Sequence, residues 1–179
     1  IGVLELLADH PWGVLEGDLR KIAELPDAPL LRFGRTWVSV SQIDTLFAVG
    51  GQLTPATVER FLEVAGIVFS ERDPALDLPP QDWWSANILG KAHPYSGTLL
   101  TGLGDTLCIL AVYGQALCGD RLGTDVQVRV DRLVRDMLTD LGPDERLSRR
   151  RLLRTFAEAS PLVFLDRLEV ELAKEEPAI

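Results

Sequence analysis

The sequence predicts a mainly α-helical fold with one small β-hairpin. Apolar residues recur at helical spacing along most of the chain, and the connections between the helices of the second half are short. Two short β-rich runs flank Gly34-Arg35, and glycine at the first position of a two-residue loop favours a type II′ hairpin. These patterns predict a winged-helix-like module at residues 1–72, followed by an antiparallel helical bundle or short α-solenoid at residues 73–179.

The first module is expected to contain two helices before the hairpin and two after it. Ser41 precedes the acidic Asp44 by three positions, which is typical of a helix N-terminus. Thr54 is an N-cap followed by proline at the first helical position, and it begins the helix with the clearest apolar stripe. The predicted elements are a helix ending near Asp9, a helix over 14–25, strands over 30–33 and 36–40, a helix ended by Gly50, and a helix from Pro55 to Phe69.

A proline-rich segment separates the two modules. Arg72–Pro80 contains three prolines, so we expect irregular structure, a module border and a hinge there. A short helix over 81–91 should follow, and His93-Pro94 should end it. The remaining helices are predicted over 97–117, from an N-cap at Thr124 to Leu141, over 148–159, and from Pro161 to Leu172.

Glycines within the helix over 97–117 predict that this helix is central and buried. Each glycine in a helix interior costs about 1 kcal/mol relative to alanine. We therefore expect close packing against a neighbouring helix to offset the cost at each of these positions, which are Gly97, Gly102, Gly104 and Gly114.

The charge balance favours a protein partner over nucleic acid or membrane. The formal net charge is −9, whereas surfaces that bind phosphates carry clustered lysine and arginine. No uninterrupted apolar run has the length of a membrane span, and no signal peptide is visible. The chain starts at Ile1 within an apolar helical pattern, which indicates a piece of a longer protein.

Neither cysteine is expected to act in redox chemistry. Cys108 and Cys118 lie ten positions apart in one predicted helix, which corresponds to about 15 Å and is too far for a disulfide. We interpret both as buried thiols in a reducing compartment, so the cytoplasm is the expected location.

Catalytic and cofactor motifs are weak or absent in the sequence. No P-loop occurs, and TGLGDTL lacks the third glycine and the preceding strand of a dinucleotide-binding turn. His93, Ser96 and Asp105 are residue types of a hydrolytic triad, but no GxSxG motif surrounds the serine. We expect His93 to end one helix and Ser96 to cap the next. No spacing of histidine and cysteine predicts a metal site, so we expect neither metal nor cofactor.

Two sets of residues are candidates for interaction. Trp83 and Trp84, with Tyr95 further along the chain, form the first set, and tryptophan is enriched at interface hot spots. Adjacent helical residues point about 100° apart, so one tryptophan should be buried and the other exposed. The basic run around Arg149, Arg150 and Arg151 is the second set; we expect a solvated helix face paired with nearby acids, and an acidic or phosphate-bearing partner is the alternative.

The order of five short motifs resembles that of a known class of protein. WVSVS, LTPATVERFLEVA, DPALDLP, YSGTLLTGLGDTLCILA and AEASPLVFLDRLE follow one another over residues 30–172. This order resembles the helical region of large multidomain bacterial STAND-like NTPases, several of them linked to anti-phage defence. The resemblance implies a non-catalytic helical scaffold between a nucleotide-binding module and a sensing or effector module.

We therefore expect a non-catalytic scaffold or interaction segment that relays conformational change between modules of a larger protein. Its working residues should be exposed aromatic or apolar groups beside the proline-rich segment rather than a polar pocket. The alternative is a winged-helix transcriptional regulator that binds DNA, although the predicted recognition helix carries Gln42 and Asp44 and no lysine or arginine. The third hypothesis is a small hydrolase that uses His93 and Ser96.

Overall fold

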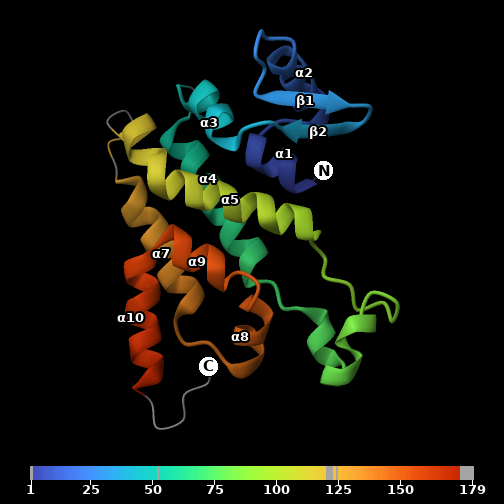
Figure 1. The fold of residues 1–179 in the computed structure, drawn as a ribbon, viewed down its shortest axis with the longest axis vertical. Coiled ribbons are helices and arrows are strands. Elements are labelled where there is room, and N and C mark those ends of the chain that lie inside the picture. The colour runs from blue at the N-terminus through green and yellow to red at the C-terminus, as the bar shows by residue number, and fades with distance from the viewer. Residues whose placement is uncertain (1, 52, 120–122, 124, 174–179) are drawn as a thin grey trace. The chain divides into compact units, whose positions relative to one another are not determined.

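The computed structural model describes residues 2–51, 53–119, 123 and 125–173. It is 69% helical, and its described residues contain a single two-stranded antiparallel hairpin, which confirms the mainly α fold (Figure 1). Thr124, the predicted N-cap, lies outside the described residues, as does the side chain of Cys118.

The chain forms two compact units. Unit 1 comprises residues 1–64 and 113–125, and unit 2 comprises residues 65–112 and 126–179. The chain passes from one unit to the other within two helices, at 64–65 and 112–113, and at the start of a third, at 125–126, rather than within the proline-rich segment. These borders differ from the predicted ranges 1–72 and 73–179, because Arg72–Pro80 belongs wholly to unit 2.

Unit 1 is built around the hairpin and the helices that flank it. The strands pair in the register Leu30↔Ser39 to Phe33↔Thr36, and Gly34 has a φ of 62°, as the first position of a type II′ turn requires. The order of elements agrees with the prediction, whereas the winged-helix likeness stays a prediction. The elements are α1 (Gly2–Ala8), α2 (Trp12–Ala23), β1 (Leu30–Phe33), β2 (Thr36–Ser39), α3 (Gln42–Gly50), the first part of α4 (Pro55–Ser70) and the π-helical turn η3 (Gln115–Gly119).

The core of unit 1 lies at α4 and the start of β1 rather than at its N-terminal helices. Its buried apolar residues in the described part of the chain are Leu30, Val58, Leu62 and Val64. Phe47 of α3 contacts Tyr113 edge to face, with ring centres 5.9 Å apart, but it is 52% exposed. In contrast, α1 and α2 contain no buried residue. They line an open cavity of about 630 Å³ together with β2, and its walls are mainly apolar: Leu4, Leu7, Ala8, Trp12, Leu15, Leu19, Arg35, Thr36 and Trp37.

Unit 2 is a helical bundle with a well-packed core. Phe69 and Phe156 contact each other edge to face with ring centres 5.9 Å apart, and both are buried. Helix α10 packs against α7 and α9 (Figure 1). Its elements are the end of α4, the 3₁₀ turns η1 (Pro74–Asp77) and η2 (Pro80–Ser85), and helices α5 (Gly97–Gly114, continuing into unit 1), α7 (Val126–Leu138), α8 (Pro143–Arg149), α9 (Leu153–Ala159) and α10 (Pro161–Leu172).

Two predicted helices of unit 2 are shorter than expected. The helix expected over 148–159 is present only as α9, from Leu153 to Ala159, which packs against α7; a separate helix, α8, runs before it from Pro143 to Arg149. The helix expected over 81–91 is the 3₁₀ turn η2, which ends at Ser85 and is followed by turns.

The glycines of α5 do not share one role. A Cβ added at Gly104 would lie 3.1 Å from the Thr155 side chain, so this glycine permits the close approach of α5 to α9. Nothing lies within 4 Å of a Cβ added at Gly97 or Gly102. The expectation that close packing offsets each glycine is therefore correct at Gly104 and wrong at the other two.

The stretch Gly97–Leu117 has the length and mean hydropathy, 1.3, of a membrane span. Within the part of the chain that the structure describes, it is the one stretch that passes this test, and 28% of it is buried. A single helix of this kind is weak evidence, because core helices of soluble proteins have the same composition. The structure therefore provides no strong evidence of a membrane span.

Candidate functional site

The proline-rich segment is held against α8 by polar contacts within unit 2. Arg72 forms ion pairs with Asp77 at 2.6 Å and with Asp144 at 2.9 Å, and these carboxylates raise its pKa. The backbone N–H of Asp73 donates to the Ser148 hydroxyl over 3.1 Å. Asp73 also caps η1, because its carboxylate accepts from the N–H of Ala75. These contacts fix the segment to α8 instead of leaving it as a free linker.

The two tryptophans that follow have different surroundings. The Trp83 indole N–H donates to the Leu78 carbonyl over 3.0 Å, and the Arg150 guanidinium lies over the Trp83 ring. Trp83 is part-buried, whereas Trp84 is 81% exposed. The sequence predicted one inner and one outer tryptophan, and the structure assigns the outer position to Trp84.

Further apolar side chains are exposed next to Trp84. Ile88 is 80% exposed and Leu89 is 56% exposed. We call Trp84, Ile88 and Leu89 the 84–89 surface. Large apolar side chains that cluster in water-exposed positions mark interaction sites. The sequence analysis identified Trp84 but not Ile88 and Leu89, which lie in turns after η2 rather than in the expected helix over 81–91.

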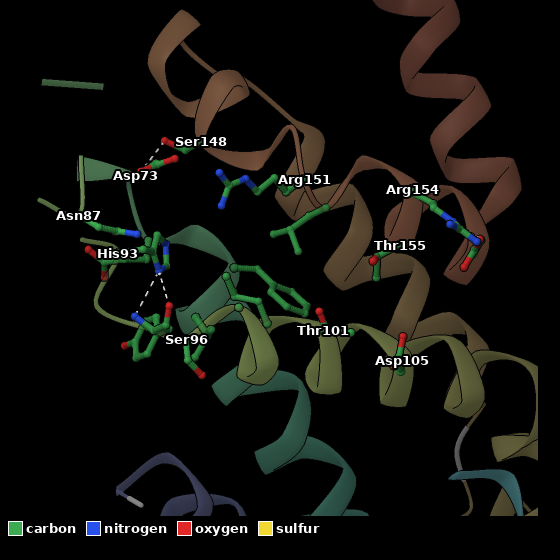
Figure 2. A pocket seen from close by; sticks show the side chains of 18 residues that line it. Asp73, Asn87, His93, Ser96, Thr101, Asp105, Ser148, Arg151, Arg154 and Thr155 are labelled. Carbon is green, nitrogen blue, oxygen red and sulfur yellow. Dashed lines mark hydrogen bonds and ion pairs between the residues drawn. The ribbon is translucent and has the colours of Figure 1, made fainter. Parts of the chain in front are cut away.

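A polar cavity of about 670 Å³ lies in unit 2, between α5, α9 and the chain that leads into α5 (Figure 2). Its inner surface includes the apolar side chains of Val68, Phe69, Leu100 and Leu152. Polar side chains surround this floor, and Figure 2 shows them projecting from α5, from α9 and from the segment around His93. This cavity was not anticipated, since its walls come from four separate parts of the sequence.

The three residue types of a hydrolytic triad, His93, Ser96 and Asp105, all line this cavity. The His93 Nδ1 atom lies 3.2 Å from the Tyr95 backbone nitrogen and 3.1 Å from its carbonyl oxygen, so the backbone occupies it. The Ser96 hydroxyl accepts from the N–H of Leu99 over 3.2 Å, as an N-cap does. Among the described residues, no hydrogen bond joins His93 to Ser96, so the nucleophile and base of a triad are not assembled.

The three consecutive arginines point to three different environments. Arg149 is buried and donates to the Met137 carbonyl over 2.7 Å, and burial lowers its pKa. Arg150 lies over Trp83 and 3.6 Å from the Asp73 carboxylate. Arg151 is exposed, lines the cavity, and forms no hydrogen bond or ion pair within the described part of the chain. Only Arg151 of the three is therefore available to a ligand.

Tyr95 and Cys108 have local roles. The Tyr95 ring is part-buried and lies 5.9 Å from the His93 ring, so it supports the loop before α5. The Cys108 thiol donates to the Thr155 carbonyl over 3.6 Å, and burial raises its pKa to about 11. A thiol with a raised pKa is a poor nucleophile at neutral pH. In the described residues, no three histidine, cysteine or acidic side chains lie close enough together to hold a metal ion.

Comparison with family models, curated proteins and solved structures finds no match to this chain. The fold and its surfaces define a mainly helical protein with an exposed aromatic surface and a polar cavity in one of its two units.

Proposed function

We propose that this chain is a non-catalytic helical scaffold whose 84–89 surface binds another module of a larger protein, or a protein partner, and relays conformational change between modules. The observation that carries the proposal is the 81% exposure of Trp84 beside a part-buried Trp83. Tryptophan at a recognition surface supplies a large contact area with few rotatable bonds.

The way in which the 84–89 surface is supported favours a recognition role. The segment before it is bound to α8 through Arg72, Asp73 and Ser148. Lys91, just beyond it, is paired with Asp77 over 2.8 Å. Both ends of the exposed turns are therefore anchored to unit 2. A surface held in this way loses little conformational entropy when a partner binds.

The side chains that could act in catalysis are held in structural contacts, which supports the non-catalytic part of the proposal. His93 and Ser96 make backbone hydrogen bonds that stabilise the start of α5, and the pKa of Cys108 is raised. General-base catalysis at the serine would need a hydrogen bond between its hydroxyl and the imidazole.

The charges of unit 1 disfavour the winged-helix regulator as an alternative. Helix α3, the predicted recognition helix, carries Asp44 in its first turn and no lysine or arginine. Arg20 and Arg32 are both paired with Glu16, and Lys21 is paired with Asp18. DNA binding depends on cations that neutralise phosphates, and part of the positive charge of unit 1 is already offset by these acidic partners.

The proposal also covers the kind of larger protein that would contain this chain. A cytoplasmic, large bacterial STAND-like NTPase with a role in anti-phage defence would provide the neighbouring modules that such a scaffold connects. The supporting observations are the order of the five motifs in the sequence and the net charge of −9, which suits a protein partner.

Site-specific photo-crosslinking tests the proposal in the intact protein that contains this chain. Benzoylphenylalanine at position 84 should crosslink to one recurring peptide of another module or partner. The matched control is position 162 on α10, where Leu162 is 78% exposed in the same unit. Crosslinks that are equally scattered from both positions would contradict the proposal. Hydrolysis of an ester, peptide or nucleotide that Ser96→Ala abolishes would contradict its non-catalytic part.

A further inference from the structure

We propose that the polar cavity of unit 2 binds a small organic acid, with its carboxylate on Arg151 and its apolar body on the cavity floor. This ligand site does not depend on the 84–89 surface or on any partner that the surface binds. Four observations of different kinds support it.

The first observation is that Arg151 has no partner among the described residues, although its neighbours in the basic run are engaged. Arg149 and Arg150 bind a carbonyl and a carboxylate, and Arg154 is paired with Glu158 over 2.8 Å. Arg151 lines the cavity and has no hydrogen bond or ion pair to any residue that the structure describes. Its guanidinium therefore keeps its N–H donors for a ligand, and the planar fork matches a carboxylate.

The second observation is that two further polar groups reach the same end of the cavity. Figure 2 shows the side chains of Asn87 and His93 pointing toward the region that Arg151 approaches from the opposite wall. Because the Tyr95 backbone occupies Nδ1 of His93, the other ring nitrogen is the one that can face a ligand. An amide, an imidazole and a guanidinium together can bind both oxygens of one carboxylate.

The third observation concerns the floor. Leu100 is part-buried and Leu152 is 8% exposed, and both line a cavity of about 670 Å³, whereas Val68 and Phe69 in its lining are almost fully buried. Ligand sites in proteins combine an apolar lining with a few placed polar groups, and volumes of about 300–1,000 Å³ are typical. An apolar body attached to the carboxylate would cover this floor.

The fourth observation is that most of the acidic groups around the cavity already have partners, so they oppose an anionic ligand less than free carboxylates would. Glu71, Asp73, Asp105 and Glu158 also line the cavity. Asp73 and Glu158 are each paired with an arginine, and Asp105 also has an interaction partner. Inorganic phosphate can also pair with a guanidinium, but it has no apolar body to cover the apolar part of the cavity lining. A carboxylate attached to an apolar body is therefore the better match for this cavity.

Titration followed by two-dimensional NMR on the whole chain tests the site. The probes are 4-phenylbutyrate, its uncharged amide and inorganic phosphate, each added to about 10 mM, where even weak binding is visible. The variants are Arg151→Gln and the matched control Arg135→Gln, which removes an exposed arginine of α7 away from the cavity. The wild type should bind 4-phenylbutyrate with shifts confined to the cavity walls.

The proposal predicts that Arg151→Gln weakens this binding about tenfold, because the charge-assisted hydrogen bonds are lost. Arg135→Gln should leave the affinity within about twofold, since exposed charges off the site contribute little. The amide and phosphate should bind at least about tenfold more weakly than 4-phenylbutyrate. No binding of the acid, equal weakening by both variants, or phosphate binding more tightly than the acid would each overturn the proposal.

Discussion

The Arg150 guanidinium lies 5.1 Å from the centre of the Trp83 ring, so a cation covers one face of the inner tryptophan. The same side chain lies 3.6 Å from the Asp73 carboxylate. Arg150 thus connects the chain after α8 with both ends of the segment that contains η1 and η2. The exposed Trp84 is presented by a segment that this contact and the Trp83–Leu78 hydrogen bond hold in place.

The two tryptophans should differ in their contribution to stability. Trp83→Ala removes the Arg150 contact and the indole hydrogen bond, and should lower the free energy of unfolding by about 2–3 kcal/mol. Trp84→Ala removes an 81%-exposed side chain and should change it by less than about 0.5 kcal/mol. Urea denaturation of both variants measures the difference. Equal losses would show that Trp84 is structural.

The glycines of α5 provide a second matched pair. Gly104→Ala brings a methyl group to 3.1 Å from Thr155, so it should destabilise unit 2 by about 1–2 kcal/mol despite the better helix propensity of alanine. Gly102→Ala meets open space and should stabilise by about 0.5–1 kcal/mol. Thermal unfolding would contradict the close α5–α9 packing if both variants were stabilised.

Local signals in the sequence were sufficient to predict most of the helices. Ser41, Thr54 and Ser96 each accept the backbone N–H three residues on, as N-caps do. The hairpin register follows from the turn residue Gly34 in the same way. These features depend on neighbours in the sequence, so propensity and spacing are enough to find them.

The sequence did not reveal the features that depend on contacts between distant residues. Arg149 and Arg151 look equivalent in a basic run, yet Arg149 is buried and donates to the Met137 carbonyl, whereas Arg151 lines a cavity. The Pro-rich segment looked like a hinge because its attachment through Asp73 to Ser148 spans 75 positions. Only tertiary packing distinguishes these environments.

Arg149 and Arg151 should therefore respond differently to the same substitution. Arg149→Met keeps most of the apolar stem but leaves the Met137 carbonyl at the end of α7 without this donor, and should cost about 1–3 kcal/mol. Arg151→Met should change stability by less than about 0.5 kcal/mol, because Arg151 is exposed. Urea unfolding compares the two. A larger loss at Arg151 would contradict the assigned environments.

Cys108 should resist alkylation in the folded chain. Burial is the main cause that raises its pKa from 9.0 to about 11, so the thiolate fraction at about pH 8 is about a hundredfold lower than in the unfolded chain. Since the folded pKa is raised, this thiol favours folding below about pH 9, and that contribution is lost as the pH rises through about 11.

A variant with Cys118 replaced by serine isolates the reaction of Cys108 with iodoacetamide. The rate at about pH 8 should be about a hundredfold lower than in urea, and it should rise steeply towards about pH 11. Equal rates in the folded and unfolded chains would show that Cys108 is accessible and unperturbed.

Hydroxyl-radical footprinting of Trp84 tests the interaction surface most directly. In the isolated chain, Trp84 and the control Leu162 are both largely exposed and should oxidise readily. In the intact protein that contains this chain, we expect oxidation of Trp84, Ile88 and Leu89 to fall about tenfold while that of Leu162 is unchanged, because a bound module or partner excludes water from an interface centre. Unchanged oxidation of Trp84, in every assembly that the intact protein forms, would show that the 84–89 surface binds no module or partner.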